Sequence, residues 1–203
     1  ERVDERDLGV DGALGVELRG LLRAHGQVAD EDVDLGLTQG GDHVDRLLVG
    51  GGMAYTFLAA QGHEVGTSLL EADQIDAVRG FIDQAQAKGV ELLLPVDVVI
   101  ADAFAADAAS QVVDAAAIPA GWMGLDIGPR TRELFASRIA DAGTVVWNGP
   151  MGVFEKPPFD KGTMALANAV ANSTGTSVVG GGDSEKAIKA AGVTFVASML
   201  ERV

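Results

Sequence analysis

The sequence predicts an α/β fold over residues 44–203, in which a mostly parallel sheet lies between two layers of helices, as in Rossmann-like domains. Three observations support this prediction. Short apolar runs alternate with longer amphipathic segments, which is typical of repeated strand–helix units. The short runs are continuously apolar, as expected for parallel strands that are buried on both faces. Several of these runs end in glycine-rich turns, where a chain passes from a strand into a helix.

The first half of this region contains three apolar runs and two amphipathic segments. The apolar runs predict strands, the amphipathic segments predict helices, and the mixed alanine-rich stretch that continues to Ile118 has no assigned element. In chain order the elements are a strand at Val44–Val49, helices at Met53–Gln61 and Ala72–Lys88, and strands at Glu91–Leu94 and Val96–Ala101.

The second half of the region repeats the alternation more regularly. Each strand is again short and apolar, and each helix is longer and amphipathic. In chain order the elements are a helix at Pro129–Ala142, a strand at Thr144–Trp147, a helix at Gly162–Asn172, a strand at Ser177–Val179, a helix at Asp183–Ala191 and a strand at Thr194–Val196.

Composition excludes several functional classes. The chain has 203 residues, with 15 Lys and Arg against 30 Asp and Glu, and therefore a formal net charge of −15. Such an acidic chain is not expected to bind nucleic acid or anionic membranes. The absence of cysteine excludes thiolate chemistry, disulfides and cysteine zinc sites. No apolar run is long enough to span a membrane and no signal peptide is recognised, so a cytoplasmic location is expected.

Residues 1–43 differ in composition and in hydrophobic periodicity from the rest of the chain. They are acidic, contain no lysine and show no sustained periodicity, although Leu14–Leu22 could form a short helix. We interpret them as a divergent acidic segment that is poorly packed or disordered. Its origin has three explanations, namely a native divergent segment, a foreign extension, or a stretch read in a shifted coding frame.

Three glycine-rich turns follow predicted strands, at Gly50–Gly52, Asn148–Gly152 and Gly180–Ser184. Carboxyl ends of parallel strands meet at one edge of a sheet, so these turns are expected to share one crevice. The last turn also presents backbone N–H groups at a helix N-terminus, which favours an anion. The sequence therefore predicts a site for a phosphorylated ligand, although neither the P-loop nor the dinucleotide-binding motif is present.

Individual polar residues have two interpretations each. Asp183 is either a helix N-cap or, with the glycines and Ser184 around it, a ligand for Mg²⁺. Glu155 and Lys156 could be an exposed ion pair rather than part of a site. Trp122 and Trp147 are expected in the core, and the three histidines, His25, His43 and His63, are expected at the surface.

Five segments together resemble the phosphoglycerate kinase family, in its order and near its spacing. The match extends over about residues 44–190 and corresponds to the C-terminal, nucleotide-binding lobe of that family. The segments are Val49–Phe57, Leu94–Asp97, Ile118–Pro129, Val146–Glu155 and Val179–Ser184.

The resemblance implies an enzyme that transfers the acyl phosphate of 1,3-bisphosphoglycerate to Mg-ADP, giving 3-phosphoglycerate and ATP in glycolysis. It further implies that Asp183 binds Mg²⁺, that Glu155 accepts hydrogen bonds from the ribose, and that the amides of Gly181 and Gly182 contact the phosphates together with Ser184. The residues that it places around the adenine are Gly51, Gly52, Leu69, Gly124, Leu125, Asn148, Pro150 and Val153.

The chain also departs from the family pattern. Nothing in residues 1–43 resembles the N-terminal lobe, which binds the triose substrate, so that substrate is expected only if a second lobe is present. The family's lysine-bearing segment before the first glycine turn is not recognised, since the first lysine is Lys88. The family's final glycine-rich loop is also absent.

These departures predict a nucleotide-binding chain that is inactive by itself. The alternative is a non-catalytic Mg-nucleotide-binding or interaction domain. A dinucleotide-dependent oxidoreductase has less support, because the fingerprint loop is absent.

Overall fold

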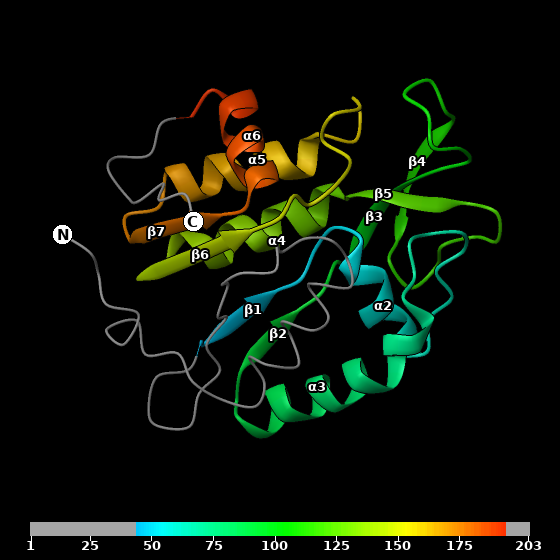
Figure 1. Ribbon diagram of the computed structural model, residues 1–203, viewed down its shortest axis with the longest axis horizontal. Coiled ribbons are helices and arrows are strands. Elements are labelled where there is room, and N and C mark those ends of the chain that lie inside the picture. The colour runs from blue at the N-terminus through cyan, green and yellow to red at the C-terminus, as the bar shows by residue number, and fades with distance from the viewer. Residues whose placement is uncertain (1–43, 194–203) are drawn as a thin grey trace.

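The computed structural model describes residues 44–193, and Figure 1 shows their arrangement. The helices and strands alternate along the chain, which confirms the predicted α/β class. The elements are β1 (Arg46–Leu48), α2 (Met53–Ala60), the 3₁₀ helix η2 (Ala72–Gln74), α3 (Ile75–Ala87), β2 (Glu91–Leu93), β3 (Asp97–Ala101), β4 (Ser110–Asp114), β5 (Met123–Ile127), α4 (Pro129–Ala140), β6 (Thr144–Asn148), α5 (Lys161–Ala171), β7 (Thr176–Gly180) and α6 (Gly182–Ala191).

Two pairs of parallel strands form the centre of the molecule. Strand β1 pairs with β2, and β6 pairs with β7, both in parallel. Figure 1 shows the two pairs side by side. Leu48 of β1 and Leu93 of β2 pack into the same hydrophobic cluster as Trp147 of β6, so the pairs share one core. The carboxyl ends of β1, β6 and β7 each lead into a glycine-rich turn.

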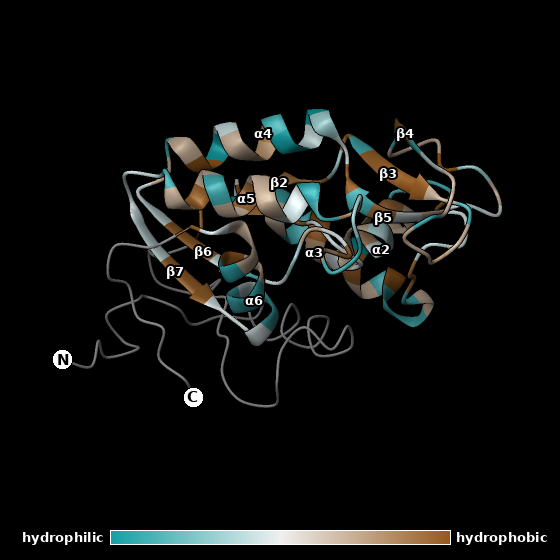
Figure 2. Ribbon diagram, turned by 90° about the horizontal axis from the view of Figure 1, so that it is seen from above, coloured by the Kyte–Doolittle hydropathy of each residue, from teal (hydrophilic) through white to brown (hydrophobic). Residues whose placement is uncertain are grey.

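Helices cover the strands from two sides. On one side, α2 and α3 pack through Phe57 and Phe81, whose rings meet edge to face at 5.8 Å, and Leu47 and Leu92 pack against them. On the other side, apolar residues of α4, α5 and α6 form a second cluster with Trp147. Figure 2 shows that β3, β6 and β7 are largely hydrophobic, whereas α4 and α5 carry many hydrophilic residues. With helices packed on both sides of the strands, the structure has the predicted layers of helix, sheet and helix.

Besides the two parallel pairs, a third sheet of three strands differs from the expected parallel arrangement. Strand β3 lies between β4 and β5 and pairs antiparallel with both. Neither β4 nor β5 was predicted. β4 is an edge strand with mostly exposed residues in an alanine-rich segment, and β5 contains Gly124 and Asp126, so neither has a continuous apolar run. A strand at Val96–Ala101 was expected and is observed as β3, but its pairing partners are these two unrecognised strands.

The other predicted elements in the described residues lie within a few positions of the observed ones. The predicted helix at Ala72–Lys88 begins with η2 and continues as α3. The predicted segment 1–43, including the helix at Leu14–Leu22, and the predicted strand at Thr194–Val196 lie outside the described residues. No helix within residues 44–193 is long and apolar enough to cross a membrane.

Asp97 connects the antiparallel sheet to α4. Its side chain is 1% exposed and accepts hydrogen bonds from the backbone N–H groups of Arg130 and Thr131, at 3.1 and 2.8 Å, and from the Thr131 hydroxyl at 2.7 Å. These donors lie in the first turn of α4, which begins at Pro129 and has no capping side chain at its own N-cap, Gly128. Asp97 therefore caps the helix from a different element and satisfies N–H groups that a helix cannot pair internally.

Candidate functional site

The three glycine-rich turns meet at one edge of the parallel strands. A Cβ atom built on Gly50 would lie 2.3 Å from Sδ of Met151, and one on Gly181 would lie 2.5 Å from Oδ1 of Asn148. The backbone N–H of Gly149 also donates to Oγ of Ser184 at 2.8 Å. The turn after β6 thus contacts both the turn after β1 and the turn after β7. The structure brings together the three segments that the sequence predicted to form one crevice.

The turn after β7 leaves the N-terminus of α6 open. Gly181 has a φ of +85°, and no side chain caps the helix. Gly181 and Gly182 are exposed, and a Cβ on Gly182 would contact nothing within 4 Å. The N–H groups at this end therefore combine an accessible backbone with the positive end of the helix dipole, which is suitable for an anion.

The two polar residues that follow have different environments. The side chain of Asp183 is 56% exposed, whereas Ser184 is fully buried. Because Oγ of Ser184 accepts the hydrogen bond from Gly149, Ser184 joins the turns after β6 and β7. Its predicted contact with phosphate stays a prediction.

Gly181→Ala is expected to weaken anion binding at α6. Alanine is strained at a φ of +85°, and its Cβ would collide with Asn148. We expect about a tenfold weaker affinity for ADP by calorimetry and a loss of about 1–3 kcal/mol in the free energy of unfolding. Gly192→Ala is the control, because Gly192 also has a positive φ, of 66°, but lies in open space at the C-terminus of α6. Equal loss of ADP affinity in both variants would contradict the assignment.

Residues from four chain segments form the wall predicted to hold an adenine ring. Leu69 is 57% exposed, an unusual position for a large apolar side chain, and its Cδ2 would lie 2.6 Å from a Cβ on Gly52. On the same wall, the N–H of Val153 donates to the carbonyl of Leu125 at 2.9 Å. Because the segment of Leu69 also contacts β5 through Ser68 and Gly124, the predicted residues Gly52, Leu69, Leu125 and Val153 lie in adjoining segments, with Leu69 accessible to a ligand.

Gly124 has a packing role that the sequence did not indicate. Its N–H donates to Oγ of Ser68 at 2.9 Å, and a Cβ there would lie 2.1 Å from the Tyr55 hydroxyl oxygen. Glycine at this position allows α2 to approach β5 closely. Burial and the neighbouring Asp126 carboxylate raise the pKa of Tyr55 well above its ordinary value, so its hydroxyl stays protonated.

Within residues 44–193, Asn148 is the residue whose buried side-chain polar atoms have no hydrogen-bond partner. Both Oδ1 and Nδ2 are unpaired, and the side chain points toward Gly181 at the junction of the turns after β6 and β7. A buried amide without partners is costly unless a ligand or water completes its hydrogen bonds. This observation fits a polar group of a ligand bound at the junction, which is the position predicted for the nucleotide.

The carboxylates expected for the metal and the ribose are both exposed and lie near one ammonium group. Nζ of Lys186 is 2.7 Å from Oδ1 of Asp183, and Glu155 also attracts this lysine. The hydrogen bond to Asp183 raises the pKa of Lys186, with smaller contributions from both carboxylates. No group of three or more potential metal ligands occurs in residues 44–193. One carboxylate still fits Mg²⁺, which commonly uses one or two protein carboxylates together with phosphate oxygens and water.

Asp126 packs beneath the wall residues Leu125 and Val153 and contacts the segments that carry them. Its buried carboxylate accepts from the N–H groups of Ile127 and Gly162, at 2.8 and 2.7 Å, and a Cβ on Gly152 would lie 2.4 Å from Oδ1. Burial raises its pKa to about 7, although the two amides and the Arg132 charge oppose this shift. The carboxyl therefore connects β5, the turn after β6 and the start of α5.

Asp126→Asn is expected to change how stability depends on pH. The folded-state pKa is raised to about 7 from about 3.9 in an unfolded chain, so the folded protein binds the extra proton between these values. This contribution to stability is largest below about pH 4 and is lost as the pH rises to 7, by up to about 4 kcal/mol. Urea denaturation from pH 4.5 to 8 should show this loss in the native chain and a flatter profile in the variant. Parallel profiles would contradict it.

Phe104 is a candidate for contact with the ligand that the sequence pattern did not indicate. It lies in the loop between β3 and β4, its side chain is 56% exposed, and Nζ of Lys156 lies 4.9 Å from the centre of its ring. Lys156 adjoins the Val153–Glu155 segment, so the ring lies near the predicted wall. An aromatic residue within an otherwise small and polar segment was the available signal in the sequence.

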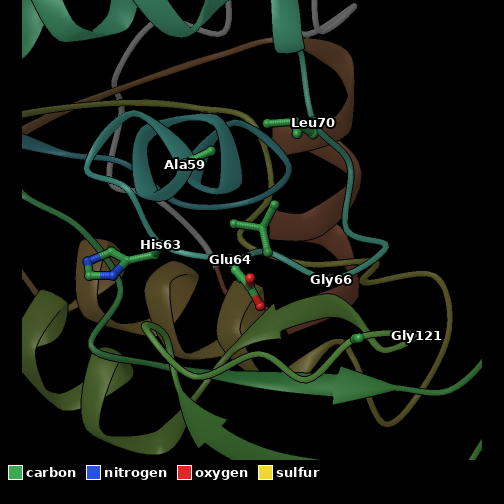
Figure 3. Close-up of a pocket in the computed structure, with 8 residues that line it drawn as sticks. Ala59, His63, Glu64, Gly66, Leu70 and Gly121 are labelled. Atoms are coloured by element: carbon green, nitrogen blue, oxygen red, sulfur yellow. The ribbon is translucent and has the colours of Figure 1, made fainter.

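A separate depression lies beside the end of α2 (Figure 3). It has a volume of about 370 Å³ and is formed by Ala59, residues 63–66, Leu70, Ala120 and Gly121. None of the predicted site residues lines it. Figure 3 shows the His63 ring and the Glu64 carboxylate extending in different directions, so they do not form an acid–base pair. His63 is half-buried rather than fully at the surface.

Comparisons with known proteins agree with the resemblance in the sequence. The family model described as phosphoglycerate kinase matches residues 37–199. The chain is 60% identical over 152 residues to phosphoglycerate kinase from Acidobacterium capsulatum and 61% identical over 148 residues to that from Kineococcus radiotolerans. These matches cover 74% and 73% of this chain, but only 38% and 36% of the two relatives.

A solved structure of phosphoglycerate kinase from Coxiella burnetii has a similar fold. It aligns with a TM-score of 0.74 and 42% sequence identity over 90% of this chain and 44% of that protein. This chain therefore spans less than half the length of the proteins that it matches. The family model covers most of the chain, and the chain belongs to the phosphoglycerate kinase family.

Proposed function

We propose that this chain binds a magnesium adenine nucleotide where the turns after β1, β6 and β7 meet. The observation that carries the proposal is the direct contact between these turns, which places the open N-terminus of α6 beside the unpaired Asn148 amide. In this arrangement, Leu69 and the Leu125–Val153 wall contact the adenine, Glu155 accepts from the ribose, and the amides of Gly181 and Gly182 bind phosphate.

We further propose that the nucleotide site serves the phosphoglycerate kinase reaction in a longer protein or complex. Phosphoryl transfer depends mainly on positioning and on neutralising charge. Asp183 would hold Mg²⁺, which supplies positive charge to the phosphates when it is bound. The α6 amides orient the phosphate chain, and the apolar wall fixes the base, so the terminal phosphate has a defined position.

The remaining parts of the reaction lie beyond what this chain supplies. The 3-phosphoglycerate or 1,3-bisphosphoglycerate would bind to a second lobe, and closure of the two lobes would exclude water. We therefore propose that the chain is inactive by itself, functions in glycolysis in the cytoplasm, and binds neither nucleic acid nor membranes. Its net charge of −15 supports the last two points.

Calorimetric titration with ADP, with and without Mg²⁺, tests the nucleotide site. We expect binding that strengthens with Mg²⁺, and no turnover in a coupled assay with 1,3-bisphosphoglycerate and ADP. Failure to bind Mg-ADP would overturn the proposed site. Clear turnover by the isolated chain would overturn only the proposal that it needs a second lobe.

The second candidate is a non-catalytic nucleotide-binding or interaction domain. The observation that favours it is that no lysine precedes Lys88, whereas the family carries two lysines that contact the phosphates before the first glycine turn. Adding a separately prepared N-terminal lobe of a family member distinguishes the candidates. Restored turnover supports the kinase, whereas nucleotide binding without restored turnover supports the second candidate.

A further inference from the structure

The carboxylate assigned to the metal is occupied by a positive charge from the same helix. Nζ of Lys186 lies 2.7 Å from Oδ1 of Asp183, one helical turn earlier on α6. Both side chains are exposed, by 68% and 56%, so the ammonium can move away without breaking core contacts. Glu155, which we assign to the ribose, attracts the same ammonium. The ammonium is therefore paired with the proposed metal ligand, and Glu155 acts on it only through a weaker attraction.

The same helix contains a second ion pair of similar geometry. Nζ of Lys189 lies 2.6 Å from Oε1 of Glu185, and the lysine is 72% exposed. This pair lies one turn further along α6 and involves neither Asp183 nor Glu155. The two lysines therefore share a helix, a charge and an exposure, and they differ in the carboxylate that they bind.

We propose that Lys186 is a tethered cation that competes with Mg²⁺ for Asp183 and contacts the nucleotide phosphates when the metal is absent. This inference rests on the proposed function, because it requires that Asp183 is the metal ligand. The two cations are attracted to the same carboxylate and repel each other, so metal binding weakens the contact between the ammonium and Asp183. Lys186 is the fifth residue of α6, so its ammonium then stays near the N-terminal turn and the anion that the helix binds.

The size of the effect follows from the exposure of the pair. Exposed ion pairs contribute little free energy, so releasing Asp183 from Lys186 should change the apparent Mg²⁺ affinity by about two- to fivefold. The same ammonium should strengthen metal-free ADP binding by a similar factor. Lys186 therefore weakens metal binding and strengthens metal-free ADP binding, and both effects reduce the dependence of nucleotide binding on Mg²⁺.

The test compares Lys186→Met with the matched control Lys189→Met in the full chain. Both variants lose one positive charge from α6, so long-range electrostatic effects are nearly equal. ADP affinity is measured by calorimetry in EDTA and in saturating Mg²⁺, and the affinity for Mn²⁺ without nucleotide is measured by electron paramagnetic resonance. Relative to Lys189→Met, we expect Lys186→Met to bind ADP two- to fivefold more weakly in EDTA and Mn²⁺ two- to fivefold more tightly.

The possible outcomes distinguish failure of this inference from failure of the proposed function. If the native chain binds ADP more tightly with Mg²⁺ but the two variants behave alike, the role of Lys186 is overturned and the nucleotide site stands. If the native chain does not bind Mg-ADP, both are overturned. Lys186→Arg should behave like the native chain, because it keeps the charge, and a twofold or larger departure would also count against the proposal.

Discussion

Asp183→Asn is expected to remove most of the Mg²⁺ dependence of ADP binding. The substitution keeps the size of the side chain but removes the negative charge that favours a divalent cation, and the described part of the chain contains no group of three or more potential metal ligands to replace it. We expect the Mg²⁺-dependent gain in ADP affinity to fall by about 10–100-fold, a range comparable to the loss of a residue that supports a metal site. Calorimetry with and without Mg²⁺ measures this gain directly.

A matched control exists on α3. Asp76 is an exposed carboxylate that also pairs with a basic residue three positions later, Arg79, at 2.9 Å. Asp76→Asn should leave the Mg²⁺ dependence unchanged. If Asp183→Asn retains the native dependence, then Asp183 is only an exposed residue in the first turn of α6 and the metal must bind elsewhere.

Asp97→Ala is expected to cause the largest loss of stability. The substitution removes a buried carboxylate and leaves the N–H groups of Arg130 and Thr131 without their acceptor, while the Thr131 hydroxyl keeps only the backbone carbonyl of residue 97. Arg130 also loses its ion pair with β3, in which its Nε lies 3.5 Å from Oδ2 of Asp97. We expect a decrease of about 2–4 kcal/mol in the free energy of unfolding, measured by urea denaturation at pH 7.

The pH dependence of Asp97 is opposite to that of Asp126. Burial alone would raise the pKa of Asp97, but the hydrogen bonds from Thr131 and Arg130 lower it below its ordinary value. Its contribution is therefore present above the unfolded pKa of about 3.9 and is lost as the pH falls through the folded value. The difference between native and variant stability should shrink below about pH 4. Asp141→Ala, which breaks an exposed pair with Arg46, should have a small effect at every pH.

The predicted and observed elements show where sequence patterns were informative. The helix at residues 75–87 has an apolar face that packs through Val78 and Phe81, and such a face repeats at helical spacing. Strand β6 was predicted from its run of apolar residues. By contrast, β4 is an exposed edge strand, and its pairing with β3 depends on hydrogen bonds to a distant segment rather than on its own residues.

In the candidate site, too, some features could be predicted from the sequence and others depend on the folded structure. The glycine turns after strands predicted which segments would meet, because glycine is needed where a chain turns sharply or another group approaches, and the structure shows these turns in contact. The sequence did not reveal that Ser184 binds the turn after β6, that Asn148 has no partner, or that Lys186 occupies Asp183. These contacts join residues whose relative positions depend on how two strands and a helix pack.

The amino-acid sequence by itself determined the α/β class, the family and the turns that carry the candidate site, because apolar periodicity and glycine-rich motifs are local properties. Only the tertiary structure decided the antiparallel pairing around β3, the capping of α4 by Asp97 and the raised pKa of Asp126. Burial and hydrogen bonding between segments distant in sequence set these features. A side chain's charge and role therefore depend on neighbours that only the folded chain supplies.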